Sequence, residues 1–309
     1  MRLFAAFAIA KFLRFLTRLR GGGSAFPGFV LLRLVPDALE RAVGSLPRGV
    51  IFVTGSNGKS TTAAMLTEIL RAHGLRVFSN PAGGNLPQGL ASALVGGASL
   101  LGRVAADIAV LEVDEAYGPP ISDLVAPDWV VITNIQVDQL NRFGEPEAVY
   151  RLLLTLGHRA KAGVVINGSD PNTTALGAEL HATGTRVEQM QVSSAAQATA
   201  AHGLVPAPLF FDPLPNLAVA PGVVVSAVRG PQTRLDVGGA VWKVTLPQPG
   251  LHYAVDAGLA MEMASVVLQD FQPERAVAAL ELGAGVYGRG EVIRYRGVEI
   301  SLIMMKNLP

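Results

Sequence analysis

The stretch around residue 50 constrains the fold of this chain more than any other. Val50–Val53 is a short apolar run, typical of a strand that is covered on both faces. Gly55 and Gly58 follow it, and glycine lets backbone N–H groups approach an anion closely. A helical pattern then runs from Ser60 to His73. Because a helix N-terminus carries free N–H donors and partial positive charge, this strand, loop and helix predict a phosphate site.

Two side chains of the loop carry the predicted chemistry. Lys59 is placed to reach the β- and γ-phosphates of a nucleotide, and the Ser60 hydroxyl is placed to hold Mg²⁺. The loop is not a regular G-x-x-x-x-G-K-[ST] pattern, because Val53 stands where that pattern has its first glycine. A glycine-rich turn with a solvated lysine is the alternative interpretation. The order of strand, loop, lysine–serine pair and helix favours nucleotide binding.

Composition narrows the class of protein. The chain has 309 residues, of which 50% are hydrophobic and 16% charged, enough for one large domain with smaller parts. The formal net charge is +1, so no global field argues for a nucleic-acid partner. The absence of cysteine excludes disulfides and thiolate metal sites, and nothing indicates an extracellular compartment.

Strands and helices alternate after the phosphate loop, which predicts an α/β fold with a doubly wound, mostly parallel sheet. In such a sheet the functional loops lie at the carboxyl ends of the strands. We expect strands at Arg76–Phe78, Asp107–Val113, Trp129–Thr133 and Gly163–Ile166, with helices near Gly89–Val95 and Glu147–Arg159.

Three domains are expected from changes in this pattern. Residues 1–45 read as an N-terminal basic amphipathic helix and linker, residues 46–285 as an ATP-binding central domain, and residues 286–309 as the start of a C-terminal α/β domain. Strand patterns at Glu291–Tyr295 and Val298–Met304 have little chain after them, so we expect that last domain to be truncated.

The α/β pattern decays within the central domain over residues 187–246, which predicts a degenerate β insertion. Strands are expected there at Val223–Ser226 and Ala240–Leu246. Two helices should follow, at Ala254–Leu268 and Pro273–Leu282.

The first twenty residues differ from the rest of the chain. Leu3–Ala10 is apolar, and basic residues then interleave with phenylalanines and leucines. The run is far shorter than the ~20 residues that span a bilayer. Most of the positive charge follows the run, whereas in a signal peptide it comes before. We predict a basic amphipathic helix that packs on the body, with contact to a membrane surface as the alternative.

Polar segments follow two successive strands. Glu112, Asp114 and Glu115 end the third strand with hard oxygen ligands of the kind that a Mg²⁺–nucleotide site requires. Thr133–Glu145 follows the fourth. Either segment alone could be an ordinary polar loop. Their occurrence after neighbouring strands of a phosphate-binding sheet favours a single site.

These motifs resemble a known superfamily. Thr54–Thr61 is similar to the T-G-[TS]-N-G-K-[ST]-[TS] loop of Mur ligases and folylpolyglutamate synthases. Thr133–Glu145 has Gln139 where many Mur ligases have a metal-binding histidine, and it looks like the version found in MurT-type ligase subunits of lipid II isoglutaminyl synthases. Ser79–Gly89 and Asn167–Asn172 are also similar to the MurT type.

The resemblance implies ATP and Mg²⁺ as cofactors and assigns roles to particular residues. Lys59 and Glu112 are the implied catalytic residues, with Ser60 and Glu112 as Mg²⁺ ligands and Gln139 as a further candidate. Asn85 is expected near the base. The expected ATP-binding residues are Thr54, Gly55, Ser56, Asn57, Gly58, Lys59, Ser60, Thr61, Asn85 and Asn134.

The implied activity is ATP-dependent amidation of the D-glutamate α-carboxylate in the lipid II stem peptide, giving D-isoglutamine through an acyl phosphate. The implied partner is a GatD-like glutaminase that supplies ammonia. Few residues precede the phosphate loop, so we expect a lipid-linked substrate instead of one held by a nucleotide-binding domain. The implied location is the cytoplasm, including the inner face of the plasma membrane.

The chain also departs from the MurT pattern. It has no four-cysteine zinc ribbon and no histidine pair with ligand spacing, so no structural zinc is expected. Tyr253 and Asp256 replace two asparagines that face the nucleotide in the family. Two alternatives stay open: an amino-acid-adding ligase of the Mur or folylpolyglutamate type, and a truncated, non-catalytic nucleotide-binding chain.

Overall fold

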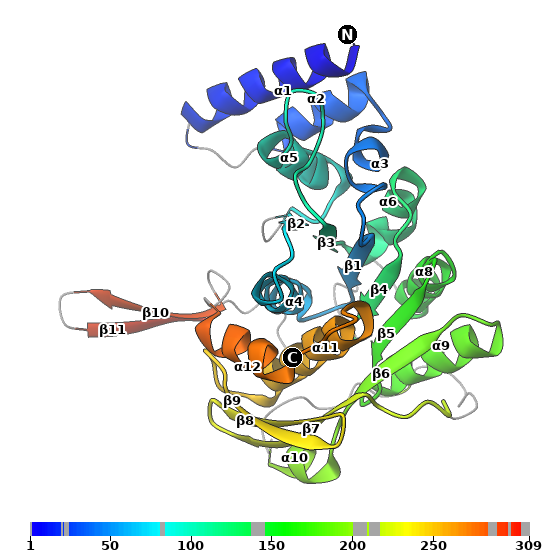
Figure 1. The fold of residues 1–309 in the computed structure, drawn as a ribbon, viewed down its shortest axis with the longest axis vertical. Coiled ribbons are helices and arrows are strands. Elements are labelled where there is room, and N and C mark those ends of the chain that lie inside the picture. The colour runs from blue at the N-terminus through cyan, green and yellow to red at the C-terminus, as the bar shows by residue number, and fades with distance from the viewer. Residues whose placement is uncertain are drawn as a thin grey trace.

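One nine-stranded sheet runs through the molecule (Figure 1). The computed structural model describes residues 2–19, 21, 25–80, 84–136, 146–199, 209, 217–283, 289–295 and 298–303. The strands of the sheet are β1 (Val50–Thr54), β2 (Val77–Ser79), β3 (Ile108–Glu112), β4 (Trp129–Ile132), β5 (Gly163–Asn167), β6 (Val187–Val192), β7 (Val223–Arg229), β8 (Gln232–Val237) and β9 (Ala240–Thr245).

The strand order is β2-β3-β1-β4-β5-β6-β7-β8-β9. Neighbours are parallel from β2 through to β7, and β7, β8 and β9 are antiparallel. The chain runs from β1 outward to β2, returns through β3, and then crosses to β4 on the other side of β1. In open α/β sheets this reversal marks the place where ligands bind, at the carboxyl ends of the strands. The predicted doubly wound, mostly parallel α/β sheet is confirmed.

Helices cover both faces of the sheet. The described α-helices are α1 (Arg2–Leu19), α2 (Phe26–Leu34), α3 (Ala38–Val43), α4 (Lys59–Ala72), α5 (Pro87–Gly97), α6 (Gly118–Leu124), α8 (Pro146–His158), α9 (Pro171–Ala182), α10 (Ser194–Ala198), α11 (Leu251–Val267) and α12 (Pro273–Leu282). A short 3-10 helix, η1, covers Glu115–Tyr117.

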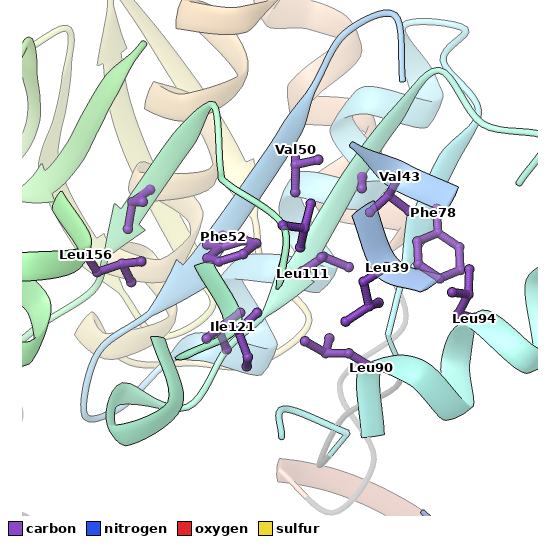
Figure 2. Packing of buried hydrophobic residues seen from close by; sticks show 14 of the residues in the cluster. Leu39, Val43, Val50, Phe52, Phe78, Leu90, Leu94, Leu111, Ile121 and Leu156 are labelled. Atoms are coloured by element: carbon purple, nitrogen blue, oxygen red, sulfur yellow. The ribbon is translucent and has the colours of Figure 1, made fainter. Parts of the chain in front are cut away.

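Alternate residues of the central strands enter two separate cores, which is why these strands read as continuous apolar runs. Val50 and Phe52 pack with residues of α3, α5, α6 and α8. Ile51 and Val53 face the opposite core, formed with α4, α11 and α12. Figure 2 shows the first of these cores, where Phe52 and its strand neighbours face leucines from the surrounding helices.

The N-terminal helices form a layer beyond β2 and β3. α1 packs against α2 and α5, and α2 lies along α5, as Figure 1 shows. The predicted packing of the N-terminal helix on the body is therefore observed. Within the described residues, no helix combines the length and the low charge that a membrane span requires.

The second half of the chain extends the sheet. β6 pairs in parallel with β5, although residues from Val187 onward gave no clear pattern in the sequence. β7 to β9 continue from β6, and α11 packs on this half of the sheet and against α4. A separate antiparallel pair, β10 (Arg289–Tyr295) and β11 (Val298–Ile303), follows α12. The proposed domain boundaries, including the insertion at 187–246 and a truncated domain at 286–309, stay predictions.

Candidate active site

The loop after β1 needs glycine at two positions. Gly55 has φ 123°, and a Cβ built on it would lie 2.3 Å from Oγ1 of Thr133. Gly58 has φ 82°, and its Cβ would lie 2.2 Å from Oδ1 of Asp256. Both backbone conformations are strained for other residues. Gly58 is also the N-cap of α4, and no side chain caps this helix end. The first N–H groups of α4 are thus available for an anion.

Residues after β4 hold the loop in shape. The backbone N–H of Ser56 donates to the carbonyl of Asn134 at 2.9 Å, and that of Asn57 donates to Asn134 Oδ1 at 2.9 Å. Thr133 Oγ1 donates to the carbonyl of Asn57 at 2.5 Å. Asn57 Nδ2 donates to Gln136 Oε1 at 2.9 Å. Asn134, predicted as an ATP ligand, is placed here as a support of the loop, and its contact with ATP stays a prediction.

Lys59 lies folded back against its own loop. Its ammonium donates to the carbonyls of Gly55 at 2.6 Å and Ser56 at 3.1 Å, and to Glu115 Oε1 at 2.9 Å. An ammonium has three donors, so these contacts occupy all of them. Lys59 and Glu115 are both buried. Lys59 must therefore exchange at least one of these partners when it contacts a phosphate.

Glu115 completes a buried ion pair that the sequence did not reveal. Burial raises the pKa of the Glu115 carboxyl, and the Lys59 ammonium opposes that rise. Its second oxygen, Oε2, is buried and has no hydrogen-bond partner in the described residues. An unpartnered carboxylate oxygen beside a phosphate loop is a feature that a bound cation or a polar ligand group would satisfy.

Glu112 is fixed at the end of β3 by two asparagines. Glu112 pairs with Val53, the residue before the end of β1, in the parallel pairing of β3 with β1. Its backbone N–H donates to Asn80 Oδ1 at 2.8 Å, and Asn80 Nδ2 donates back to its carbonyl at 3.0 Å. Asn85 Nδ2 donates to Glu112 Oε1 at 3.2 Å. Asn85 thus orients the carboxylate, while its predicted contact with the base stays untested.

The two positions at which the chain departs from the MurT pattern lie on α11. Asp256 packs over the loop, and Thr62 Oγ1 donates to its Oδ1 at 3.3 Å. Tyr253 is buried in the core beneath α11. The fold therefore brings Asp256 next to the phosphate loop although 194 residues separate it from Thr62 in the sequence.

The segment between β5 and α9 contacts the residues that follow β4. Asp170 caps α9 and accepts hydrogen bonds from the backbone N–H groups of Asn172 and Thr173, both at 2.9 Å. Asn172 Nδ2 donates to the carbonyl of Ile135 at 3.1 Å, next to the residues that hold the loop. Burial raises the pKa of Asp170 to about 6, and backbone hydrogen bonds oppose that rise. This segment therefore ties the end of β5 to the end of β4.

The residues present fit the phosphates of a nucleotide with a divalent cation. The loop supplies glycines, an uncapped helix N-terminus and a lysine, and carboxylates lie beside it. Thr54, Ser60 and Thr61 are buried at the junction of β1 and α4. Ser60 and Glu112 would hold Mg²⁺, which neutralises charge on the β- and γ-phosphates when it is bound. Gln139, the further metal candidate, lies outside the described residues.

The geometry agrees with a comparison of the sequence with protein families. Residues 53–205 match the Mur ligase middle domain. Over these residues, about half of its length, the chain is similar to Mur ligases. The matched residues include the phosphate loop and the residues that end β3 and β4, and they extend through the support formed by Asp170. The Mur ligase resemblance expected from the motifs is thereby confirmed.

Two curated relatives are similar to parts of this chain. The lipid II isoglutaminyl synthase (glutamine-hydrolyzing) subunit MurT of Streptococcus pneumoniae is 38% identical over 152 residues, which are 49% of this chain and 33% of that protein. The UDP-N-acetylmuramate–L-alanine ligase of Thermobifida fusca is 28% identical over 260 residues, 84% of this chain and 48% of that protein. The chain thus spans a third to a half of the length of these relatives.

Solved Mur ligase structures share the fold. MurF from Acinetobacter baumannii superposes with a TM-score of 0.66 at 20% identity, covering 88% of this chain and 54% of that chain. MurF from Thermotoga maritima in complex with ADP gives 0.63 at 17% identity, covering 89% and 57%. At this identity the likeness supports the arrangement of strands and helices.

Most of the residues that meet at this site, but not all of their contacts, could be expected from the sequence. The structure brings Thr54–Thr61, Glu112, Asn85 and Asn134 together as expected. The structure also shows that Glu115 contacts Lys59, that Gln136 contacts Asn57 of the loop, and that Asp170 caps the helix behind the end of β4. The one available signal for Glu115 was its place three residues after Glu112 at the end of the strand.

Proposed function

We propose that this chain is the ligase body of an ATP-dependent enzyme that amidates the D-glutamate α-carboxylate of the lipid II stem peptide. The observation that carries the proposal is the buried cluster of Lys59, Glu115 and Glu112 around a glycine phosphate loop. The MurT name of relatives with matching motifs supports the choice of substrate. Both the substrate and the partner rest on this similarity.

The reaction would proceed in two steps. An oxygen of the α-carboxylate attacks the γ-phosphorus of ATP, the bond to the bridging oxygen breaks, and ADP leaves. The nitrogen of ammonia then attacks the acyl carbon, phosphate departs, and the added nitrogen loses a proton to give the amide. The chain's own contribution is positioning and charge neutralisation, because phosphoryl transfer asks little covalent chemistry of a protein.

Particular residues have separable roles in this scheme. Lys59 would leave one of its loop carbonyls or Glu115 and contact the transferred phosphate. Glu112, oriented by Asn85, would hold the cation together with Ser60. The N–H groups at the start of α4 would contact the phosphate oxygens, as helix N-termini do.

A second candidate function is amino-acid addition, as in UDP-N-acetylmuramate–L-alanine ligases. It is favoured by the length of the match to such a ligase, which covers 84% of this chain against 49% for the MurT subunit. Both functions use the same activation of a carboxylate by ATP, so the phosphate loop does not distinguish them. The nucleophile and the acceptor do.

The deciding assay offers each acceptor with its nucleophile and follows the products by mass spectrometry. With ATP and an ammonium salt, lipid II should gain an amide, whereas UDP-N-acetylmuramate with L-alanine should be unchanged. With glutamine as the nitrogen source, a GatD-like glutaminase should be required to release ammonia from glutamine, because free ammonia is scarce near neutral pH. Addition of L-alanine to UDP-N-acetylmuramate would overturn the proposal in favour of the second function. Efficient use of glutamine by the chain alone would overturn the role of the partner.

A further inference from the structure

Exposed apolar side chains gather in the N-terminal helical layer. Of the fifteen large apolar side chains that are exposed in the described residues, ten lie in α1, in α2 or in the turn after α5. Most of them belong to α1, where Phe12 is 61% and Leu19 is 70% exposed. Clusters of this kind on a folded protein mark an interaction surface. The ten are Phe4, Ile9, Phe12, Phe15, Leu16, Leu19, Phe26, Phe29, Leu100 and Leu101.

α1 uses only a narrow side for packing. Ala6, Phe7 and Ala10 are its buried residues, against α2 and α5. At 100° per residue, its exposed apolar side chains span an arc of about 140°, and every residue within that arc is apolar. We name this arc the α1 outer face. It consists of Phe4, Ala5, Ala8, Ile9, Phe12, Phe15, Leu16 and Leu19.

Cations border the α1 outer face on both sides. By the same helical geometry, Lys11 and Arg18 lie along one border and Arg2 along the other. The Lys11 ammonium donates to the carbonyl of Val95 at 2.9 Å, at the end of α5, and this contact fixes the rotation of α1 about its axis. The outer face is therefore held outward by the packing of the helix itself.

The charge of this layer has a single sign. The first 36 residues contain six of the 25 basic residues of the chain and none of its 24 acidic residues. In the described part of the chain, no salt bridge involves a basic residue of α1. Burial and the neighbouring Arg14 lower the pKa of Lys11, as expected for crowded cations without a counter-ion. An occupant of this face must therefore supply negative charge around an apolar surface.

We infer that the α1 outer face docks on the surface of a membrane that contains anionic lipids. An apolar arc with aromatic side chains and bordering cations matches a helix that lies in the interface, with its apolar side among the acyl chains. A second copy of the chain fits less well, because a two-fold contact of this face would set like charges against each other. This inference stands apart from the proposed reaction, since it rests on α1 and not on the phosphate loop.

Vesicle sedimentation with the full chain tests the inference. The probes are phosphatidylcholine vesicles with and without added phosphatidylglycerol. Phe12→Ser/Phe15→Ser should weaken binding to the anionic vesicles at least about 20-fold, because two half-inserted rings are lost. Arg18→Gln should weaken binding to the anionic vesicles about fivefold, and added salt should also weaken this binding. Leu282→Ser and Arg229→Gln, which change exposed residues elsewhere, should bind as the wild type does.

Each outcome decides the question. The replaced side chains are exposed, so the variants should melt at the wild-type temperature, and this check separates lost binding from lost folding. No binding of the wild type to anionic vesicles, or equal binding by the Phe12→Ser/Phe15→Ser variant, would overturn the inference. If the wild type does not bind vesicles but forms a dimer, and the Phe12→Ser/Phe15→Ser variant is monomeric, the α1 outer face contacts a second copy of the chain instead.

Discussion

Glu262 should make the stability of this protein depend on pH. The side chain lies on α11 with 2% of its surface exposed, and its carboxylate lies against Gly222, the residue before β7. Its Oε2 has no hydrogen-bond partner in the described residues. Burial raises the pKa of Glu262 to about 8, the backbone N–H groups of Val223 and Gly222 oppose the rise, and the charge of Glu188 adds to it.

The sign and size of the effect follow from proton linkage. The folded pKa of about 8 lies above the ordinary value of 4.5, so the folded protein binds the proton more tightly than the unfolded chain does. The free energy of unfolding should therefore fall as the pH rises between these two values. A gap of about 3.5 pH units sets an upper limit of about 5 kcal/mol. Between pH 6 and pH 8 the loss should be about 2 kcal/mol.

Urea unfolding of the wild type and of Glu262→Gln at pH 6 and pH 8 measures this loss. The glutamine cannot ionise, so the variant should gain about 2 kcal/mol relative to the wild type across this interval, whatever its own offset. Glu274→Gln, on the exposed side of α12, serves as the matched control and should follow the wild type. If the difference between the wild type and Glu262→Gln stays constant with pH, the carboxyl is ionised throughout and the reasoning is wrong.

Three further predictions concern the site and its support. Glu115→Ala leaves the buried Lys59 ammonium without its carboxylate and should lower the free energy of unfolding by about 3–5 kcal/mol, measured by urea unfolding. The double variant Lys59→Met/Glu115→Leu should lose much less unfolding free energy than the sum of the losses of the two single variants. Additive losses would refute the coupling between the two residues. Asp170→Ala removes the cap of α9 and should cost about 1–2 kcal/mol in the same assay, whereas a cost near zero would show that the cap is dispensable. Elemental analysis of the purified, untagged protein should find no stoichiometric zinc, because the five histidines are scattered along the chain; one zinc per chain would contradict this.

The first half of the sheet could be predicted because its signals are local. Val50–Val53 is apolar without interruption because both faces of β1 are covered. The helical pattern expected to end at His73 ends at Ala72, the last residue of α4. β6 could not be predicted in the same way. Val187–Val192 contains Glu188, Gln189 and Gln191, and it is a strand because β5 and β7 pair with it on both sides.

The candidate site shows the same division. The loop and Glu112 follow from residues adjacent in the sequence, together with the rule that strand ends meet at one edge of a parallel sheet. Asp256 lies about 200 residues after the loop it packs on, so only the tertiary fold could bring it there. The three contacts of Lys59 depend on side-chain conformation, which no motif specifies.

We expect the loop after β1 to bind Mg²⁺–ATP through Lys59. Titration of the full chain with a fluorescent ATP analogue in the presence of Mg²⁺ tests it most directly, with Lys59→Ala compared against Lys243→Ala, an exposed lysine on β9. Losing one charge-assisted contact is worth about 1.5–3 kcal/mol, so Lys59→Ala should bind at least about 10-fold more weakly. Lys243→Ala should bind as the wild type does. Equal affinity of all three proteins, or no binding by the wild type, would contradict the claim.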